Sequence, residues 1–256
     1  MNDSPLLDFD DERTAIIEPS MWYPHIDGLS TAAVMTWMPD AFARLLDEHA
    51  HEVRHHVQAE TLDTKIYEVD LDGTPIVATL AHVGAPAAAA LLEVLVALGC
   101  STVFAVGSSG GLVQQHPPGT VVVPDAAIRD EGVSHHYAAA SRIAHPDPTL
   151  QAELRAAFRA VDLEPVTGHV WTTDALFRET SAKVAARVAE GAVAVDMELS
   201  ALATVAAFRG VRHGHAVYMA DTLFGDEWDP TELIERDTAF RYQLLLTAAR
   251  TSAAHA

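Results

Sequence analysis

Short apolar runs alternate with longer segments of helical pattern along most of this chain, and no other feature constrains the fold as strongly. Residues 102–106, 166–172 and 215–220 are strand-like runs, and at least one helix-like segment separates each from the next. This alternation favours an α/β fold, in which helices cover a mostly parallel sheet. We therefore predict one three-layer α/β/α domain over residues 1–256. We expect its central sheet to be mixed and mostly parallel. We also expect an irregular N-terminal segment over residues 1–40.

The region before residue 100 departs from this alternation. Residues 41–60 are charged and compatible with a helix. Residues 66–69 and 76–81 are strand-like and flank Asp72-Gly73, which predicts a turn between two strands. A helix is expected to follow Gly84 and to end at Gly99.

Composition excludes several classes of function. A net charge of -20, with Lys65 and Lys183 as the only lysines, argues against binding to a nucleic-acid backbone. The single cysteine, Cys100, excludes an internal disulfide and is typical of a reducing compartment. The acidic N-terminus is unlike a signal peptide, and no apolar run is long enough to span a membrane. We therefore expect a cytoplasmic protein with no membrane partner.

The 14 histidines do not indicate a metal site. His55-His56 and His135-His136 are adjacent pairs, which lack the spacing and the flanking ligands of a zinc site. We expect no metal ion and no organic cofactor.

Polar residues follow directly after four of the predicted strands, in residues 107–112, 172–180, 196–198 and 221–228. Ligands of open α/β sheets bind at the carboxyl ends of the strands. We therefore expect these four segments to form one binding site.

An acidic triplet, Asp196-Met197-Glu198, interrupts an otherwise apolar segment where a strand is expected to become a helix. Buried carboxylates need hydrogen-bond donors, and the hydroxyl groups of a sugar are suitable donors. The Met197 thioether would supply an apolar wall. The alternative is a solvated helix start, at which acidic residues interact favourably with the helix dipole.

Five segments resemble, in order, motifs of the nucleoside phosphorylase family, which includes uridine phosphorylase and hexameric purine nucleoside phosphorylase. The resemblance extends from about Val77 to Phe240. It implies a nucleoside phosphorylase-like domain that releases a free base and a (deoxy)ribose 1-phosphate. HVGAPAAAALLEVLVALGCSTVFAVGSSGGL resembles the family's glycine-rich helix with its phosphate loop, and WTTDALFRET resembles its base pocket. VDMELSAL resembles the ribose motif. YMADTL and ERDTAF resemble the segments that carry the catalytic aspartate and its arginine partner.

The resemblance assigns roles to the ends of two strands. Glu198 would bind the ribose hydroxyls and Met197 would pack against the sugar, while Asp196 stands where the family usually has a glutamate. Asp221 would donate a proton to a departing purine base, with Arg236 stabilising the resulting carboxylate. A helix N-cap at Asp221 and a surface ion pair at Arg236 are the structural alternatives.

Two further groups of residues follow from the resemblance. The base-binding group includes Phe177, which would stack on the base or line its pocket, although a core aromatic is the alternative. Its members are Thr173, Asp174, Phe177 and Arg178. The site for phosphate or water would be formed by Gly107, Ser108, Ser109 and Gly110.

The acceptor site departs from the family pattern. The usual arginine two residues before the Gly-Ser of the loop is Ala105 here, and the usual Gly-Asp-Pro-x-Arg near the N-terminus is replaced by residues 37–41. Arg44, Arg54 and Lys65 are candidate replacements. Phosphorolysis, with inorganic phosphate as co-substrate, is the first expectation.

Hydrolysis by water is the second, with Glu18 as a possible base. A non-catalytic nucleoside-binding relative is a third. A dinucleotide-binding dehydrogenase is disfavoured, because GSSGGL lacks the G-x-G-x-x-G spacing. The resemblance also implies a homo-oligomer based on dimers, with a hexamer (a trimer of dimers) and a smaller assembly as the alternatives.

Overall fold

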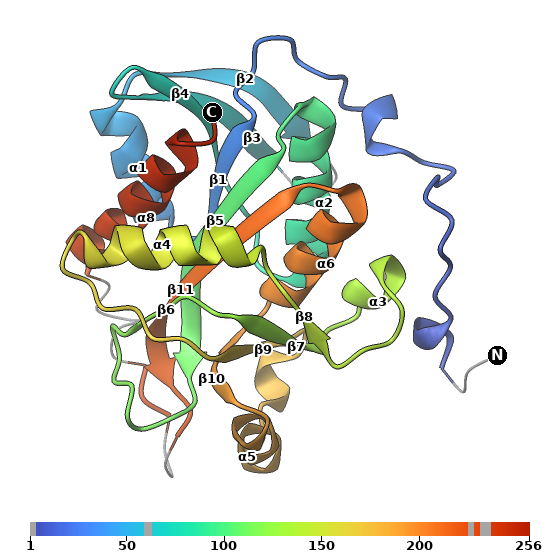
Figure 1. Ribbon diagram of the computed structural model, residues 1–256, viewed down its shortest axis with the longest axis vertical. Coiled ribbons are helices and arrows are strands. Elements are labelled where there is room, and N and C mark those ends of the chain that lie inside the picture. Colours follow the sequence, from blue (N-terminus) through green and yellow to red (C-terminus); the bar gives the residue numbers. More distant parts are fainter. Residues whose placement is uncertain (1–3, 59–62, 225–227, 231–236) are drawn as a thin grey trace.

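Helices cover both faces of a mixed β-sheet (Figure 1) in the computed structural model, which describes residues 4–58, 63–224, 228–230 and 237–256. The strand order is β2-β3-β4-β1-β5-β10-β9-β7-β8, and β11 pairs with both β5 and β6. At the centre, β4, β1, β5 and β11 pair in parallel, as do β10, β9 and β7. The α/β class expected from the alternation is confirmed. The strands are β1 (Ala32–Thr36), β2 (His51–Gln58), β3 (Asp63–Leu71), β4 (Thr74–Leu80), β5 (Thr102–Gly111), β6 (Val121–Val122), β7 (Ala126–Asp130), β8 (Ile143–Ala144), β9 (His169–Thr173), β10 (Ala192–Asp196) and β11 (Arg212–Thr222).

Two apolar cores hold the helices against the sheet. On one face α1, α4 and α8 pack around Phe104 and Val106, and on the other α2 and α6 pack around Val103 and Leu202. Among the described residues, no helix is both long and apolar enough to cross a bilayer. The helices are α1 (Pro39–Glu48), α2 (Ala85–Leu98), α3 (Ser134–Tyr137), α4 (Pro148–Arg159), α5 (Ser181–Ala189), α6 (Leu199–Arg209) and α8 (Thr238–Ala253), with 3-10 turns η1 (Pro5–Leu7), η2 (Pro19–Met21) and η3 (Leu176–Arg178).

The irregular N-terminal segment is shorter than the expected residues 1–40. Strand β1 lies in the middle of the sheet between β4 and β5, with all five residues buried, and α1 begins at Pro39. Residues 4–31 run along the outside of the molecule before they reach β1 (Figure 1). The sequence did not predict β1, because a run of only five residues between two neighbouring strands is too short to show a clear strand pattern.

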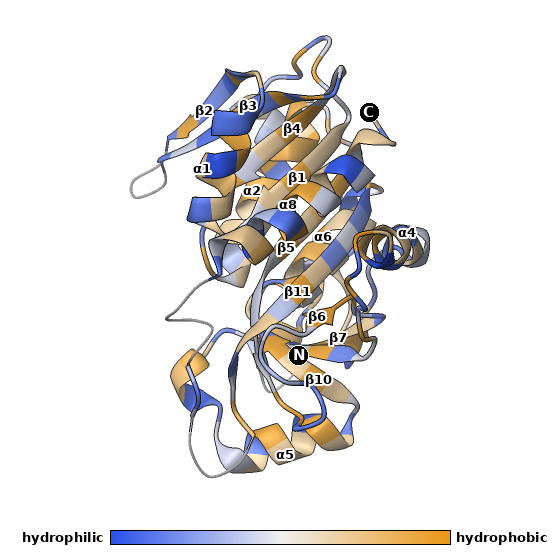
Figure 2. Cartoon of the chain, turned by 90° about the vertical axis from the view of Figure 1, so that its left-hand side faces the viewer, coloured by the Kyte–Doolittle hydropathy of each residue, from blue (hydrophilic) through white to orange (hydrophobic). Residues whose placement is uncertain are grey.

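The β2–β3–β4 edge contains one confirmed expectation and one error. The turn at Asp72-Gly73 joins β3 to β4, with φ angles of 55° and 90°. The expected helix over residues 41–60 is wrong beyond residue 48, because residues 51–58 pair with β3 as β2. In Figure 2, β3 at this edge is largely in the hydrophilic colour, whereas β1 and β4 are in the hydrophobic colours.

The glycine-rich segment 107–112, expected to be a loop, is instead largely the end of β5, which continues to Gly111. Pairing with β11 along one edge and with the end of β10 along the other keeps this segment extended. A Cβ added at Gly110 would collide with Leu223 and would lie 3.0 Å from Val195 Cγ1 and 3.3 Å from Asp221 Oδ1. The glycine therefore allows three strand ends to approach closely, and the site forms where they meet.

Candidate active site

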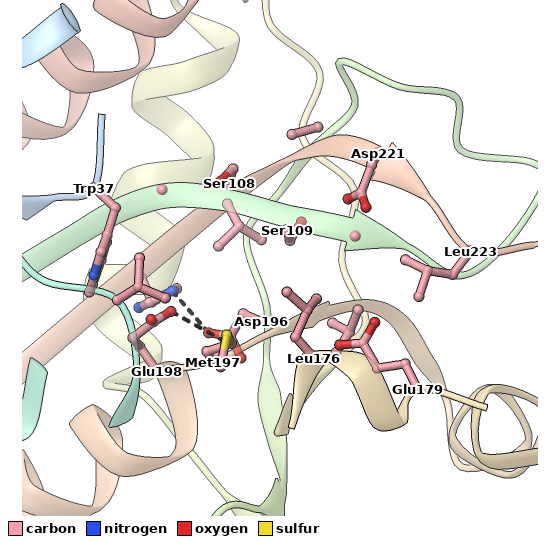
Figure 3. Close-up of a pocket in the computed structure, with 17 residues that line it drawn as sticks. Trp37, Ser108, Ser109, Leu176, Glu179, Asp196, Met197, Glu198, Asp221 and Leu223 are labelled. Carbon is pink, nitrogen blue, oxygen red and sulfur yellow. Dashed lines mark hydrogen bonds and ion pairs between the residues drawn. The ribbon is translucent and has the colours of Figure 1, made fainter. Parts of the chain in front are cut away.

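A cavity of about 250 Å³ lies where β5, β10 and β11 end, and η3 covers one side of it (Figure 3). This edge of the sheet is where ligands were expected to gather. The cavity brings together predicted residues from three separate motifs: Gly107, Ser108, Ser109, Gly110, Asp196, Met197, Glu198 and Asp221.

Glu198 lies at the junction between β10 and α6 and is 7 % exposed. Its Oε1 accepts a hydrogen bond from the Gly84 N–H at 2.6 Å, and its Oε2 accepts one from the Met197 N–H at 3.3 Å. Burial raises the pKa of Glu198, and the nearby charge of Asp196 raises it further. A ligand that donates hydroxyl hydrogen bonds to this carboxyl would favour its ionised form.

Asp196, at the end of β10, is 5 % exposed. Its Oδ1 accepts a hydrogen bond from Thr172 Oγ1 at 2.7 Å, and its Oδ2 accepts one from the Leu199 N–H at 2.8 Å. The Leu199 N–H is at the start of α6, so Asp196 does interact with a helix start, as the alternative interpretation of the acidic triplet proposed. That interpretation also expected a solvated carboxylate, whereas Asp196 is buried. Burial raises the pKa of Asp196.

Asp221 and Glu179 lie at the other end of the cavity from Glu198 (Figure 3). Asp221 is half-buried on β11, and its Oδ2 accepts a hydrogen bond from Trp228 Nε1 at 2.6 Å. Burial raises the pKa of Asp221, and the charge of Asp229 adds to this effect. A raised pKa is what a carboxyl needs to donate a proton near neutral pH. Arg236, its expected partner, lies outside the described residues.

Glu179 lines the cavity and was missed as a site residue. Burial raises its pKa to about 7, and the charge of Asp221 contributes to the same shift. The segment WTTDALFRET contains this residue, so the motif was the available signal. The sequence alone does not show that Glu179, rather than its neighbour Arg178, faces the cavity.

The raised pKa of Glu179 gives a testable stability effect. As pH rises from about 4.5 through about 7, the wild-type free energy of unfolding is expected to lose a contribution, because the folded state keeps a proton that the unfolded chain releases. Glu179→Gln removes this titration, so its stability should fall less over that range. Urea unfolding of both proteins between pH 4.5 and 8 measures the difference. Parallel curves would contradict the prediction.

The predicted base-binding residues lie outside the lining of this cavity. Thr173 is buried, and its Oγ1 accepts a hydrogen bond from the Ala175 N–H at 3.3 Å. Asp174 Oδ2 accepts one from the Gly132 N–H at 2.8 Å, and Arg178 is exposed. Phe177 is 94 % exposed, so it is not the core aromatic of the structural alternative. Their roles in binding a base stay predictions.

Leu176, the neighbour of Phe177 in η3, lines the cavity instead. Leu176→Ala is expected to raise the KM for a nucleoside about 10-fold, because it removes roughly 1.5 kcal/mol of apolar contact. Phe177→Ala is the matched control and should leave KM close to the wild-type value if the side chain stays in solvent. Steady-state kinetics of both variants test this. A larger effect for Phe177→Ala would show that η3 turns Phe177 onto the base.

Trp37 also lines the cavity, and the motifs did not identify it. Its Nε1 donates a hydrogen bond to the His82 carbonyl at 2.9 Å, which fixes the indole ring. A Cβ added at Gly107 would lie 3.0 Å from Trp37 Cε3, so the ring is against β5. The sequence showed Trp37 only as a departure from the family's N-terminal motif.

Carboxyl groups dominate the ionisable lining of the cavity. This lining consists of Glu179, Asp196, Glu198, Asp221 and one histidine, His215, and none of the described residues that line the cavity is Lys or Arg. Within the described part of the chain, no cluster of three or more His, Cys, Asp or Glu side chains could hold a metal ion.

The candidate replacements for the missing arginines lie elsewhere. Arg44 pairs with Glu48 at 2.7 Å, Arg54 pairs with Glu68, and Lys65 lies on β3 outside the lining. The possible base Glu18 is also outside the lining, and its Oε2 lies 3.4 Å from Arg209 Nη1. In one copy of this chain, no described Lys or Arg side chain therefore neutralises an anion in the cavity.

Comparisons with known proteins agree with the resemblance. A family model described as the phosphorylase superfamily matches residues 31–252. Uridine phosphorylase from Treponema pallidum (strain Nichols) is 33 % identical over 177 residues, which are 65 % of this chain and 67 % of that protein.

Two solved structures share the fold. Uridine phosphorylase from Vibrio fischeri ES114 matches with a TM-score of 0.74 and 22 % identity, over 91 % of this chain and 94 % of that chain. AMP nucleosidase from Bacteroides thetaiotaomicron VPI-5482 matches with a TM-score of 0.68 and 20 % identity, over 87 % of this chain and 88 % of that one. The same fold is therefore found in a protein named as a phosphorylase and in one named as a nucleosidase.

Proposed function

Because the chain belongs to the phosphorylase superfamily, we propose that it cleaves the N-glycosidic bond of a nucleoside. The observation that supports this most is the composition of one cavity. Glu198 and Met197 lie toward one end of it, and Asp221 lies at the other (Figure 3). A pentose on Glu198 and a base beside Asp221 would fit this arrangement.

Cleavage of the N-glycosidic bond requires the groups at both ends of the cavity. Breaking the bond between sugar and base develops positive charge on the pentose and negative charge on the departing base. The buried carboxyls near the sugar favour the first charge, and proton donation by Asp221 removes the second. Interactions that strengthen as these charges develop accelerate the reaction, rather than only holding the substrate.

A purine-type base is the proposed preference. Protonation of the leaving ring by Asp221 suits the nitrogen-rich five-membered ring of a purine, and the raised pKa of this carboxyl supports the role. The similar protein from Treponema pallidum is named as a uridine phosphorylase. Comparing inosine, adenosine and guanosine with uridine is therefore part of the test.

Phosphate is the acceptor that the family suggests. The exposed Ser108 lines the cavity, and its hydroxyl could donate a hydrogen bond to an anion. Each charge-assisted hydrogen bond to a phosphate contributes about 1.5–3 kcal/mol. With no described Lys or Arg side chain in the lining, this acceptor site is weak in a single chain.

Water is the second candidate, and the acidic lining favours it. Ala105 stands where the family's arginine would be, and the carboxylates in the cavity repel a dianion. Water is neutral and donates hydrogen bonds to carboxylates. The shared fold is compatible with either acceptor.

The test is base release from purified protein with and without inorganic phosphate. Release that depends on phosphate supports phosphorolysis, and release without phosphate supports hydrolysis. If neither condition releases a base from any of the four nucleosides, the cleavage proposal is wrong and a nucleoside-binding role is left. Light scattering of the eluted protein tests the predicted homo-oligomer in the same preparation.

A further inference from the structure

Two histidines on β11, His213 and His215, are each 1 % exposed, and the mechanism above does not use them. Their rings are in contact, with His213 Nε2 lying 3.3 Å from His215 Nδ1. Burial lowers the pKa of His213 to about 4 and that of His215 well below its usual range. Both rings are therefore neutral at physiological pH.

The hydrogen bonds fix which nitrogen of each ring carries the proton. His213 Nδ1 lies 3.1 Å from the carbonyl oxygen of Val103, and a carbonyl only accepts. His213 Nδ1 is therefore protonated and its Nε2 has the free lone pair. His215 Nδ1 must donate to that lone pair, so His215 Nε2 is itself an unprotonated acceptor.

His215 presents this acceptor at the cavity, which it lines together with Trp37, Asp196 and Glu198. Its Nε2 lies 3.7 Å from Asp196 Oδ2, too far for a direct hydrogen bond. Two acceptors at this separation suit a small molecule that donates to both. Water has two such protons, whereas the hydrogen phosphate dianion has only one.

The position of His215 in the sheet supports the same assignment. His215 on β11 is paired with Ala105 on β5, at the position where the resemblance places the phosphate-binding arginine. A neutral imidazole therefore lies beside the place of the missing guanidinium.

We propose that His215, oriented by His213 and adjacent to Asp196, binds and deprotonates the water that attacks the sugar. The inference rests on the proposed nucleoside cleavage and commits it to hydrolysis. His215 would be a catalytic residue, because it contacts the attacking oxygen, and His213 a positioning residue.

The proposed step is balanced. The water oxygen forms a bond to the anomeric carbon while the C–N bond breaks, and the electron pair of that bond leaves with the base. Asp221 gives its proton to the base, and the water gives one proton to His215 Nε2. The imidazolium is then paired with the Asp196 carboxylate and donates from Nδ1 to His213. Return of that proton to Asp221 through solvent restores the enzyme.

The experiment compares the wild type with His215→Gln in phosphate-free buffer. We expect the variant to lose about 10²-fold or more in kcat for base release, since general-base catalysis contributes about 10²–10⁴-fold. The Kd of the nucleoside should change little, because His215 binds the water and not the sugar. His145→Gln, an exposed histidine outside the cavity, is the matched control and should keep wild-type kinetics.

Two measurements separate catalysis from folding. Added imidazole should restore part of the activity of His215→Gly, which a purely structural role would not predict. Nitrogen-15 NMR of the wild type should show a His215 ring protonated at Nδ1 and unprotonated at Nε2, and this test needs no folded variant. A ring protonated at Nε2 would overturn the proposal.

The remaining outcomes are distinct. Wild-type base release that requires phosphate would leave nucleoside cleavage intact and overturn this inference. Phosphate-free release that His215→Gln retains in full would also overturn it. No release under any condition would remove the proposed function itself.

Discussion

Asp221→Asn is expected to lower kcat/KM for a purine nucleoside by about 10²–10⁴-fold, the range that a positioned proton donor contributes. Asparagine keeps the size of the side chain and can still contact Trp228, but it cannot give a proton to the leaving base. Steady-state base release across inosine, adenosine and guanosine measures the effect.

The control for this change is Asp47→Asn. Asp47 is an exposed carboxylate on α1 and does not line the cavity, so kcat should stay close to wild type. A substrate whose base leaves easily without protonation gives a second check, because Asp221→Asn should affect it much less. Full activity of Asp221→Asn on natural purine nucleosides would exclude Asp221 as the proton donor.

Glu198→Gln is expected to lower kcat/KM for a ribonucleoside by about 10²-fold or more. Hydrogen bonds from sugar hydroxyls to a charged acceptor contribute about 1.5–3 kcal/mol each, and glutamine replaces the charge with a weaker neutral acceptor. The loss should be smaller for a 2′-deoxynucleoside, which has one hydroxyl fewer to donate. Kinetics with the matched pair of substrates therefore show whether Glu198 contacts the sugar.

The stability of Glu198→Gln separates binding from folding. The glutamine Oε1 can still accept from the Gly84 N–H, and no buried charge is left behind, but the amide nitrogen no longer accepts from the Met197 N–H. Because the gain and the loss oppose each other, its melting temperature should stay close to that of the wild type. Glu164→Gln, at an exposed position outside the cavity, serves as the neutral control. Equal losses on the ribo- and deoxyribonucleoside would contradict a contact with the 2′-hydroxyl.

The sequence predicted the α/β class because short apolar runs, such as the one that forms β11, alternate with longer segments of helical pattern, such as the one that forms α4. It did not predict β1, whose five residues become a strand only between β4 and β5. Nor did it predict that β5 continues through Gly107–Gly111. Glycine disfavours a strand locally, and pairing with β10 and β11 overrides that preference.

The site could also be predicted only in part, because motifs identified some of its residues and packing determines the positions of the others. The motifs identified Glu198 and Asp221, which lie far apart in the sequence and line one cavity. They did not distinguish Leu176 from Phe177, because the orientation of a 3-10 turn depends on what it packs against. His215 also carried no signal, since its tautomer depends on a carbonyl of β5 that the sequence cannot place.

The most direct test of the account is a crystal structure with a nucleoside analogue in which a C–C bond replaces the bond to be cleaved. The account predicts the pentose hydroxyls within hydrogen-bond distance of Glu198 and the base beside Asp221, in the cavity at the end of β5. An analogue bound elsewhere, or bound with neither carboxyl in contact, would contradict it.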